Sequence, residues 1–196
     1  MAYIPRILAF AGATRTGSFN RKLIKVGIRG AEAAGAQVTH LDLRDLALPL
    51  YDGDDEEKNG LPAGALHLKE LMKTHDGLLI SSPEYNSSIS GVLKNALDWA
   101  SRPAPNEAPL ECFDGKVAAL LSASPGALGG LRGLVTVRSI LGNIKVIVLP
   151  DQVAVSKAHE AFNDDGTMKN PKQQEAVEKI GAGLAHFIAR LKGGAA

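Results

Sequence analysis

Apolar residues recur along this chain in five short runs rich in Val, Ile and Leu. The runs show no polar alternation, which is typical of parallel strands that are buried on both faces. They predict strands over Arg6–Ala11, Gln37–Leu43, Asp76–Ser82, Lys116–Ser122 and Asn143–Leu149.

Amphipathic helical patterns separate and follow these runs. In the last of them, Val177, Ile180 and Leu184 fall on one stripe, as the apolar residues of an amphipathic helix do. The patterns predict helices over Ser18–Ala34, Ala63–Thr74, Gly91–Ser101, Ala127–Leu141 and Pro171–Leu191.

Strands that alternate with helices through short connections predict a doubly wound α/β domain spanning residues 1–196. We expect a flavodoxin-like, five-stranded parallel sheet in the order 2-1-3-4-5, with helices on both faces. In that topology the ligand crevice lies between the carboxyl ends of the first and third strands.

The first strand leads into a loop of hydroxyl groups around one arginine. Thr14, Thr16 and Ser18 surround Arg15, and Asn20 closes the loop. A helix that starts near Ser18 would aim its first amides into the loop, and Arg15 offers a bidentate contact to a phosphate. The alternative is an ordinary N-cap with a surface arginine. The loop has neither a Gly-x-Gly-x-x-Gly dinucleotide fingerprint nor the Gly-Lys-Ser/Thr end of a P-loop.

The third strand leads into a second loop, Ser82-Pro83-Glu84-Tyr85-Asn86-Ser87-Ser88. Pro83 sets a turn, and Tyr85 and Asn86 would project at the carboxyl edge of the sheet. An aromatic wall with a few hydrogen-bonding groups suits a flat heteroaromatic ring. The alternative is a helix cap with a packed tyrosine. Trp99 in the following helix is better interpreted as a core or subunit-interface residue.

A third loop, Ser122–Gly130, follows the fourth strand at the same edge. Its glycines permit close approach of the backbone to a ligand, and Ser122 or Ser124 can hydrogen-bond a ring edge. Two other connections are less informative. The acidic stretch Leu48–Glu57 is either a cover over the site or a solvated loop, and Asn163–Thr167 predicts a turn or small hairpin.

Composition narrows the function classes. The 196 residues carry 22 Lys and Arg against 21 Asp and Glu, a formal charge of +1, so no strong field favours nucleic acid or a membrane surface. The single cysteine, Cys112, fits a reducing compartment, and the five histidines show no metal-ligand spacing. No signal peptide and no apolar run of roughly 20 residues is apparent. We expect a cytoplasmic protein without a metal site.

The two principal loops together predict a mononucleotide with a reactive ring, and FMN is the leading candidate. The first loop suits its phosphate and the second suits its ring. A phospho-acceptor receiver domain is excluded, because the first strand ends in Phe10-Ala11-Gly12-Ala13 without an acidic pair.

At these residues the chain resembles the NAD(P)H-dependent FMN reductase family, which includes quinone, chromate and azo-dye reductases. The family's first motif reads roughly Gly-Ser-x-Arg-x-x-Ser-x-Asn, and it is matched by Gly12, Arg15, Ser18 and Asn20. The second reads roughly Pro-Glu-Tyr-Asn-x-Ser-x-Pro-Gly-x-Leu-Lys-Asn-Ala-x-Asp-Trp. It is matched by Pro83, Glu84, Tyr85, Asn86, Ser88, Gly91, Leu93, Lys94, Asn95, Ala96, Asp98 and Trp99.

Two positions depart from these motifs. Ala13 stands in place of the usual serine and removes a hydroxyl near the phosphate, although its backbone amide remains. Ser90 stands in place of the usual proline before Gly91, which we expect to loosen that turn.

The resemblance implies a role for each loop. Arg15, Ser18 and Asn20 would hold the phosphate and ribityl end, with Gly12 and the backbone of Ala13 and Phe19 nearby. The second loop would wrap the isoalloxazine ring, and the third would contact its pyrimidine side. The ring contacts would come from Pro83, Glu84, Tyr85, Asn86 and Ser88, and the pyrimidine contacts from Ser122, Ala123, Ser124 and Gly126.

The resemblance also implies an activity. Electrons would pass from NADPH or NADH through bound FMN to quinones, azo dyes, chromate, ferric complexes or free flavin. Both substrates would use one pocket in a ping-pong cycle, and no side chain is assigned as catalytic because the flavin carries the chemistry. The family typically forms dimers or tetramers, so the expected partners are small-molecule acceptors and the chain itself. The alternative is a flavodoxin-type electron carrier without NAD(P)H activity.

Overall fold

One sheet of five parallel strands runs through the computed structural model, which describes residues 3–193. Its order is β2-β1-β3-β4-β5, as the alternation of strands and helices predicts. The strands are β1 (Arg6–Ala11), β2 (Gln37–Leu41), β3 (Gly77–Ser81), β4 (Val117–Ala123) and β5 (Ile147–Val155). The predicted flavodoxin-like topology is confirmed.

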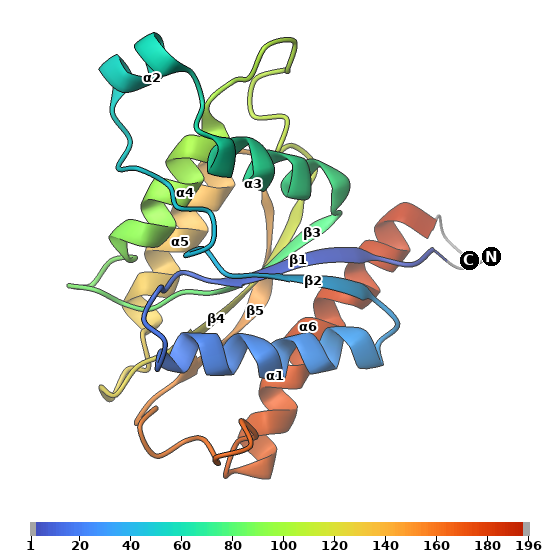
Figure 1. The fold of residues 1–196 in the computed structure, drawn as a ribbon. Coiled ribbons are helices and arrows are strands. Elements are labelled where there is room, and N and C mark those ends of the chain that lie inside the picture. The colour runs from blue at the N-terminus through green and yellow to red at the C-terminus, as the bar shows by residue number, and fades with distance from the viewer. Residues whose placement is uncertain (1–2, 194–196) are drawn as a thin grey trace.

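Helices cover both faces of the sheet (Figure 1). Side chains that alternate along β1 point to opposite layers: Ile7 and Ala9 pack with one cluster, and Leu8 and Phe10 with the other. The first cluster lies under α1 (Phe19–Ala33) and α6 (Pro171–Gly193), and the second under α3 (Ala63–Thr74), α4 (Gly91–Ser101) and α5 (Leu131–Asn143). All five strands are parallel, so the loops that lead into α1, α4 and α5 meet at one edge.

Glycines allow α1 and α6 to pack in direct contact. A Cβ atom on Gly30 would lie 2.0 Å from the Glu178 carbonyl oxygen, and one on Gly181 would lie 2.0 Å from the Gly27 carbonyl oxygen. No larger residue fits at either position without moving a helix. The crossing therefore fixes the position of α1 over the sheet.

The predicted boundaries of β5 and α5 are wrong. We expected a strand over Asn143–Leu149, but α5 extends to Asn143 and β5 runs through Pro150 and Asp151 to Val155. A proline is tolerated there because β5 is an edge strand and its pairing with β4 shifts register at this point. Helix α5 also begins at Leu131 rather than Ala127, since glycines 129 and 130 adopt positive φ angles of 63° and 94°.

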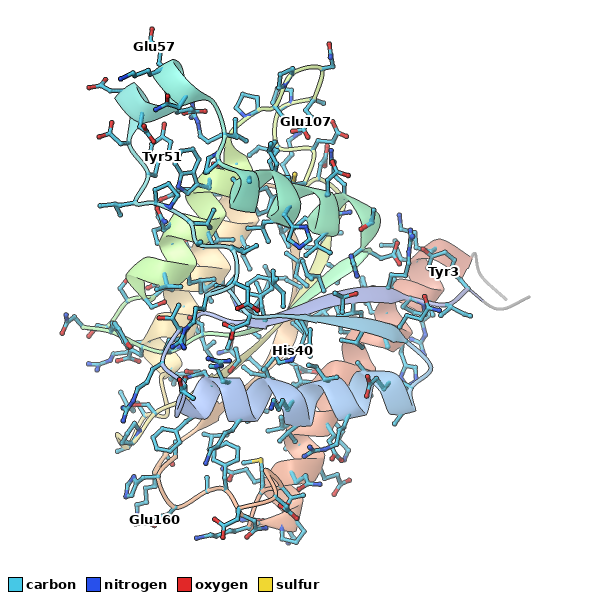
Figure 2. The ribbon with its side chains drawn as sticks, viewed as in Figure 1. Tyr3, His40, Tyr51, Glu57, Glu107 and Glu160 are labelled. Carbon is cyan, nitrogen blue, oxygen red and sulfur yellow. The ribbon has the colours of Figure 1, made fainter. Side chains whose placement is uncertain are left out.

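The acidic connection after β2 contains a short helix that was not predicted from the sequence, α2 (Gly53–Asn59). Asp52 caps it by accepting a hydrogen bond from the Asp54 amide at 2.9 Å. The Nε atom of Arg102 donates to both Glu56 carboxylate oxygens at 2.8 and 2.9 Å and holds α2 beside the end of α4. Figure 2 shows α2 projecting from the body of the molecule.

The predictions for Trp99 and for the Asn163–Thr167 turn are confirmed. Trp99 is buried and donates from Nε1 to the Pro49 carbonyl oxygen at 2.8 Å, so it belongs to the core. The Asn163–Thr167 turn closes with a backbone hydrogen bond of 2.8 Å between these two residues. In residues 3–193, no helix has the length and apolar character needed to cross a membrane.

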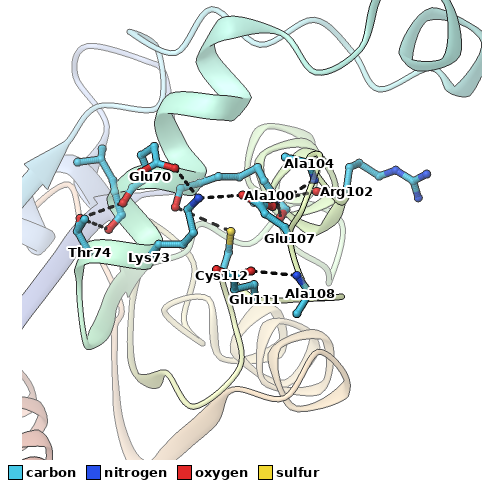
Figure 3. Close-up of polar contacts among 12 residues, drawn as sticks. Glu70, Lys73, Thr74, Ala100, Arg102, Ala104, Glu107, Ala108, Glu111 and Cys112 are labelled. Atoms are coloured by element: carbon cyan, nitrogen blue, oxygen red, sulfur yellow. Dashed lines mark hydrogen bonds and ion pairs between the residues drawn. The ribbon is translucent and has the colours of Figure 1, made fainter.

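A cluster of charged side chains fastens the long segment between α4 and β4 to α3 (Figure 3). The Glu107 carboxylate lies 2.7 Å from Nζ of Lys69 and 2.9 Å from Nζ of Lys73. Lys69 also donates to the carbonyl oxygens of Ala100 and Arg102 at 3.3 and 2.6 Å. The side chains of Lys69 and Glu107 are only 4% and 10% exposed. Burial raises the pKa of Glu107, but the two ammonium groups outweigh it and lower that pKa to about 2.

Glu107→Gln should lower the free energy of unfolding by about 3 kcal/mol at pH 7, because Lys69 would keep a buried charge without its partner. The pKa of Glu107 falls from 4.5 to about 2 on folding, so its contribution is present above pH 4.5 and is lost as the pH falls toward 2. Urea unfolding at several pH values should show the variant and wild type converging in acid. Glu111→Gln in the same segment is exposed and should change stability little; a constant difference across pH would contradict the assignment.

Candidate functional site

A cavity of about 150 Å³ opens at the carboxyl edge of the sheet, where all three loops singled out from the sequence come together. The first loop and the start of α1 form one wall, and the loops after β3 and β4 form the others. Its lining residues are Ala13, Arg15, Gly17, Ser18, Phe19, Asn20, Pro83, Glu84, Tyr85, Ala123, Ser124 and Pro125. The structure thus brings together most of the residues predicted for the site.

The start of α1 leaves hydrogen-bond donors available at this cavity. Ser18 occupies the N-cap position, but its hydroxyl accepts no capping hydrogen bond from residues 3–193. The neighbouring helices at the same edge differ, because Ser90 caps α4 and Glu84 accepts hydrogen bonds from the first turn of α5. The amides and the positive end of the helix dipole make the start of α1 suitable for an anion.

Three arginines surround the first loop, and two of them have partners. Arg21 pairs with Asp42, and Arg44 donates to the Thr14 carbonyl oxygen and, at 3.4 Å, to the Thr16 hydroxyl. These contacts hold the loop from its outer side. Arg15 is exposed, lines the cavity and makes no ion pair or hydrogen bond through its side chain within residues 3–193. It is the guanidinium available to a ligand there.

The Asn20 side chain is fully engaged with the sheet. Its Nδ2 atom donates to the Ala123 carbonyl oxygen at 2.8 Å, while Oδ1 accepts from the Ala123 amide at 3.0 Å and the Ser81 hydroxyl at 2.9 Å. Asn20 is 3% exposed and joins the start of α1 to the ends of β3 and β4. Asn20, one of the predicted site residues, therefore lines the cavity, while its polar atoms bond to the strand ends that form the cavity wall.

Gly12 and Ser90 connect the first loop to α4. The Ser90 hydroxyl donates to the Gly12 carbonyl oxygen at 2.6 Å and accepts from the Leu93 amide at 3.1 Å. A Cβ atom on Gly12 would lie 2.9 Å from Cβ of Leu93, so only glycine permits this approach. The expectation that Ser90 loosens the turn is wrong, because its hydroxyl makes two hydrogen bonds that a proline has no group to form.

The second loop forms a tight turn with a left-handed backbone. Asn86 and Ser87 have φ angles of 51° and 66°, and Tyr85 and Ser88 exchange backbone hydrogen bonds of 2.9 and 3.0 Å. Two positive φ angles in succession are typical of a type I′ turn, in which asparagine is favoured. The Tyr85 ring is left on the surface, with the residue 59% exposed.

Glu84 is the acidic residue among those that line the cavity, and its carboxylate turns away toward α5. It accepts from the amides of Arg132 and Gly133 at 3.0 and 3.3 Å and from Nε of Arg132 at 2.8 Å. Burial raises the pKa of Glu84, but the Arg132 guanidinium and these amides outweigh it and hold the pKa below its usual value. The carboxylate is therefore ionised at neutral pH.

In the third loop, Ser122 is fully buried and donates to the Ser82 carbonyl oxygen at 2.7 Å. A Cβ atom on Gly130 would lie 1.9 Å from the Ser122 hydroxyl oxygen. This contact packs the start of α5 against the end of β4. Ser124 lines the cavity, and its hydroxyl accepts a hydrogen bond of 3.3 Å from the Gly126 amide.

Five predicted residues do not line the cavity within residues 3–193: Gly12, Asn86, Ser88, Ser122 and Gly126. Two lining residues were not predicted, Gly17 and Pro125. Gly17 lies inside the first motif and Pro125 inside the third loop, so the sequence indicated them only through their predicted neighbours. Neither residue offers a side chain that itself indicates binding. Within residues 3–193, the acidic stretch 48–57 contributes no residue to the lining of this cavity. It contacts α4 instead, where the Tyr51 amide donates to the Asn95 side chain.

No group of three or more His, Cys, Asp or Glu side chains within residues 3–193 is placed to hold a metal ion. The site therefore consists of a helix start, one available arginine, a small cavity and an exposed aromatic ring beside it. Such an arrangement suits an anionic ligand that carries a flat ring.

Comparisons with known proteins agree with this chemistry. The family described as NADPH-dependent FMN reductase matches residues 5–160. An NAD(P)H-dependent FMN reductase of Pseudomonas aeruginosa is 34% identical over 189 residues, covering 96% of this chain and 97% of its own length. A probable NADPH:quinone oxidoreductase of Oryza sativa is 35% identical, with coverage of 96% and 91%.

Among solved structures, FerB, a flavoenzyme NAD(P)H:(acceptor) oxidoreductase from Paracoccus denitrificans, superposes with a TM-score of 0.79 at 27% identity. The match covers 94% of this chain and 97% of FerB.

Asn20→Ala should lower the free energy of unfolding of the ligand-free protein by about 2–4 kcal/mol. The change removes three buried hydrogen bonds, to the Ala123 amide, the Ala123 carbonyl group and the Ser81 hydroxyl, and each contributes about 0.5–1.5 kcal/mol net. Chemical denaturation without added ligand measures this directly. Asn59→Ala on exposed α2 should stay near wild type; a stable Asn20→Ala protein would contradict the structural role.

Proposed function

The chain belongs to the NADPH-dependent FMN reductase family, and from this premise we propose that it is an FMN-dependent NAD(P)H oxidoreductase. It takes electrons from NADPH or NADH and passes them to small acceptors in a ping-pong cycle. The proposed acceptors are quinones, azo dyes, chromate, ferric complexes and free flavin.

The uncapped start of α1 at the cavity is the observation that carries this proposal. Ser18 leaves the first-turn amides of the helix available, and Arg15 lies on the same cavity without another partner in residues 3–193. The starts of α4 and α5 already have side-chain oxygens on them. The start of α1 is therefore the preferred binding position for the phosphate of a mononucleotide.

The remaining lining residues are consistent with binding of the rest of the cofactor. A cavity of about 150 Å³ is small beside the roughly 300–1,000 Å³ of typical ligand pockets, so it suits the phosphate and ribityl end. The ring would lie beside Pro83 and the exposed Tyr85, with Asn86 in the adjoining turn and Ser124 near its pyrimidine side. Bound FMN supplies the capacity to accept and release electrons, while the chain orients it and limits access of water.

A second copy of the chain is the proposed cover for the exposed side of the site. Tyr85 is 59% exposed, and Leu128, Leu131 and Val135 present further apolar surface from the adjoining loop and α5. Exposed apolar patches of this kind commonly mark interfaces. A homodimer or homotetramer is proposed on this basis. A cytoplasmic location and the lack of a nucleic-acid partner follow as proposals from the single cysteine and the formal charge of +1.

Arg15→Ala should weaken FMN binding much more than riboflavin binding. Hydrogen bonds to charged groups contribute about 1.5–3 kcal/mol, which corresponds to about one to two decades in the dissociation constant. Fluorescence titration of the apoprotein with each flavin measures the ratio. Lys25→Ala removes a similar charge from the exposed face of α1 and should leave both affinities unchanged. Equal weakening of the two flavins by Arg15→Ala would place the phosphate elsewhere.

The FMN-loaded protein should lose its yellow colour rapidly when NADPH or NADH is added without air. An electron carrier without NAD(P)H activity would stay yellow under the same conditions.

In steady-state assays with a quinone, double-reciprocal plots should give parallel lines, because both substrates use one pocket in turn. Intersecting lines would show that donor and acceptor are bound together.

A further inference from the structure

The Glu84 carboxylate joins the loop after β3 to the first turn of α5. Its two oxygens accept from the Arg132 amide, the Gly133 amide and the Arg132 guanidinium, the last with Nη2 at 2.6 Å from Oε1. The Glu84 side chain is 9% exposed, whereas that of Arg132 is 58% exposed. The carboxylate thus lies in a protected position and serves as the anion at the start of α5.

Close packing reinforces this connection. A Cβ atom on Gly133 would lie 3.3 Å from both Cα and Cβ of Glu84 and 3.2 Å from the Ser88 carbonyl oxygen. The start of α5 therefore contacts both ends of the turn that contains Tyr85. This turn places two non-glycine residues at positive φ, a conformation that persists where its surroundings enforce it.

We propose that Glu84 is a positioning residue that holds the Tyr85–Ser88 turn against α5 and so fixes the ring-contacting wall of the pocket. The inference rests on the proposed function for its ligand, FMN. Every hydrogen bond of the carboxylate goes to Arg132 or Gly133, so the side chain acts on the ligand through the turn and not by direct contact. Glu84 also occupies the start of α5, which leaves the start of α1 as the place for the phosphate.

The test variant is Glu84→Gln, which keeps the size of the side chain but removes its charge and replaces one acceptor with a donor that faces Arg132. We expect dissociation constants for FMN and for riboflavin to rise by the same factor, about tenfold, since the ring wall serves both flavins. In the ligand-free protein, amide hydrogen exchange of Tyr85, Ser88 and Gly133 should become faster.

A milder variant and a matched control accompany it. Arg132→Gln keeps both backbone hydrogen bonds to Glu84 and should give a smaller rise with the same FMN-to-riboflavin ratio. Glu56→Gln breaks another carboxylate that accepts from an arginine Nε, at 2.8 and 2.9 Å, but outside the pocket. It should leave both affinities and the exchange of the turn unchanged.

Three results would overturn the inference: unchanged flavin affinities in Glu84→Gln, a loss confined to FMN, or unchanged amide exchange of the turn. A loss confined to FMN would mean that Glu84 acts on the phosphate. If wild-type protein binds no FMN, the proposed function fails, and the exchange measurement on ligand-free protein still decides whether Glu84 holds the turn.

Discussion

The buried carboxamide of Asn20 is the interaction on which the pocket depends. It joins the start of α1 to the end of β3 through Ser81 and to the end of β4 through Ala123. Ser81 and Ala123 are the last residues of their strands, and the loops of the cavity begin directly after them. Three hydrogen bonds to one rigid, planar carboxamide hold the start of α1 against the ends of β3 and β4. Burial makes each of these bonds costly to break. The same residue therefore lines the cavity and supports its walls.

The helix starts around the cavity differ in whether a side-chain oxygen already occupies them. The loops that form the cavity lead into α1, α4 and α5, and each of these helices carries a partial positive charge at its start. Ser90 and Glu84 supply oxygen to α4 and α5, while the hydroxyl of Ser18 makes no cap with any described residue of α1. Among these three helix starts, that of α1 is the one without a side-chain oxygen from residues 3–193, which supports the phosphate position proposed above.

Other stabilising contacts lie away from the cavity. The Lys69–Glu107–Lys73 cluster and the glycine crossing of α1 with α6 lie outside the pocket lining. They fix the positions of α3 and α1 without contributing a group to the cavity. The strained turn at Asn86 and Ser87 lies beside the cavity, where a fixed backbone shape matters for a ligand.

The order of strands, the fold and the three loops of the site were determined by the sequence itself. Parallel strands buried on both faces require continuous apolar runs, and short connections restrict how such runs assemble. The partners of individual side chains were decided only by the tertiary structure. Asn20 and Ala123 are 103 positions apart and Glu84 and Arg132 are 48 apart, so no local pattern shows that they meet. The path of β5 through Pro150 likewise depends on its place at the edge of the sheet, where the missing amide has no ladder partner to lose.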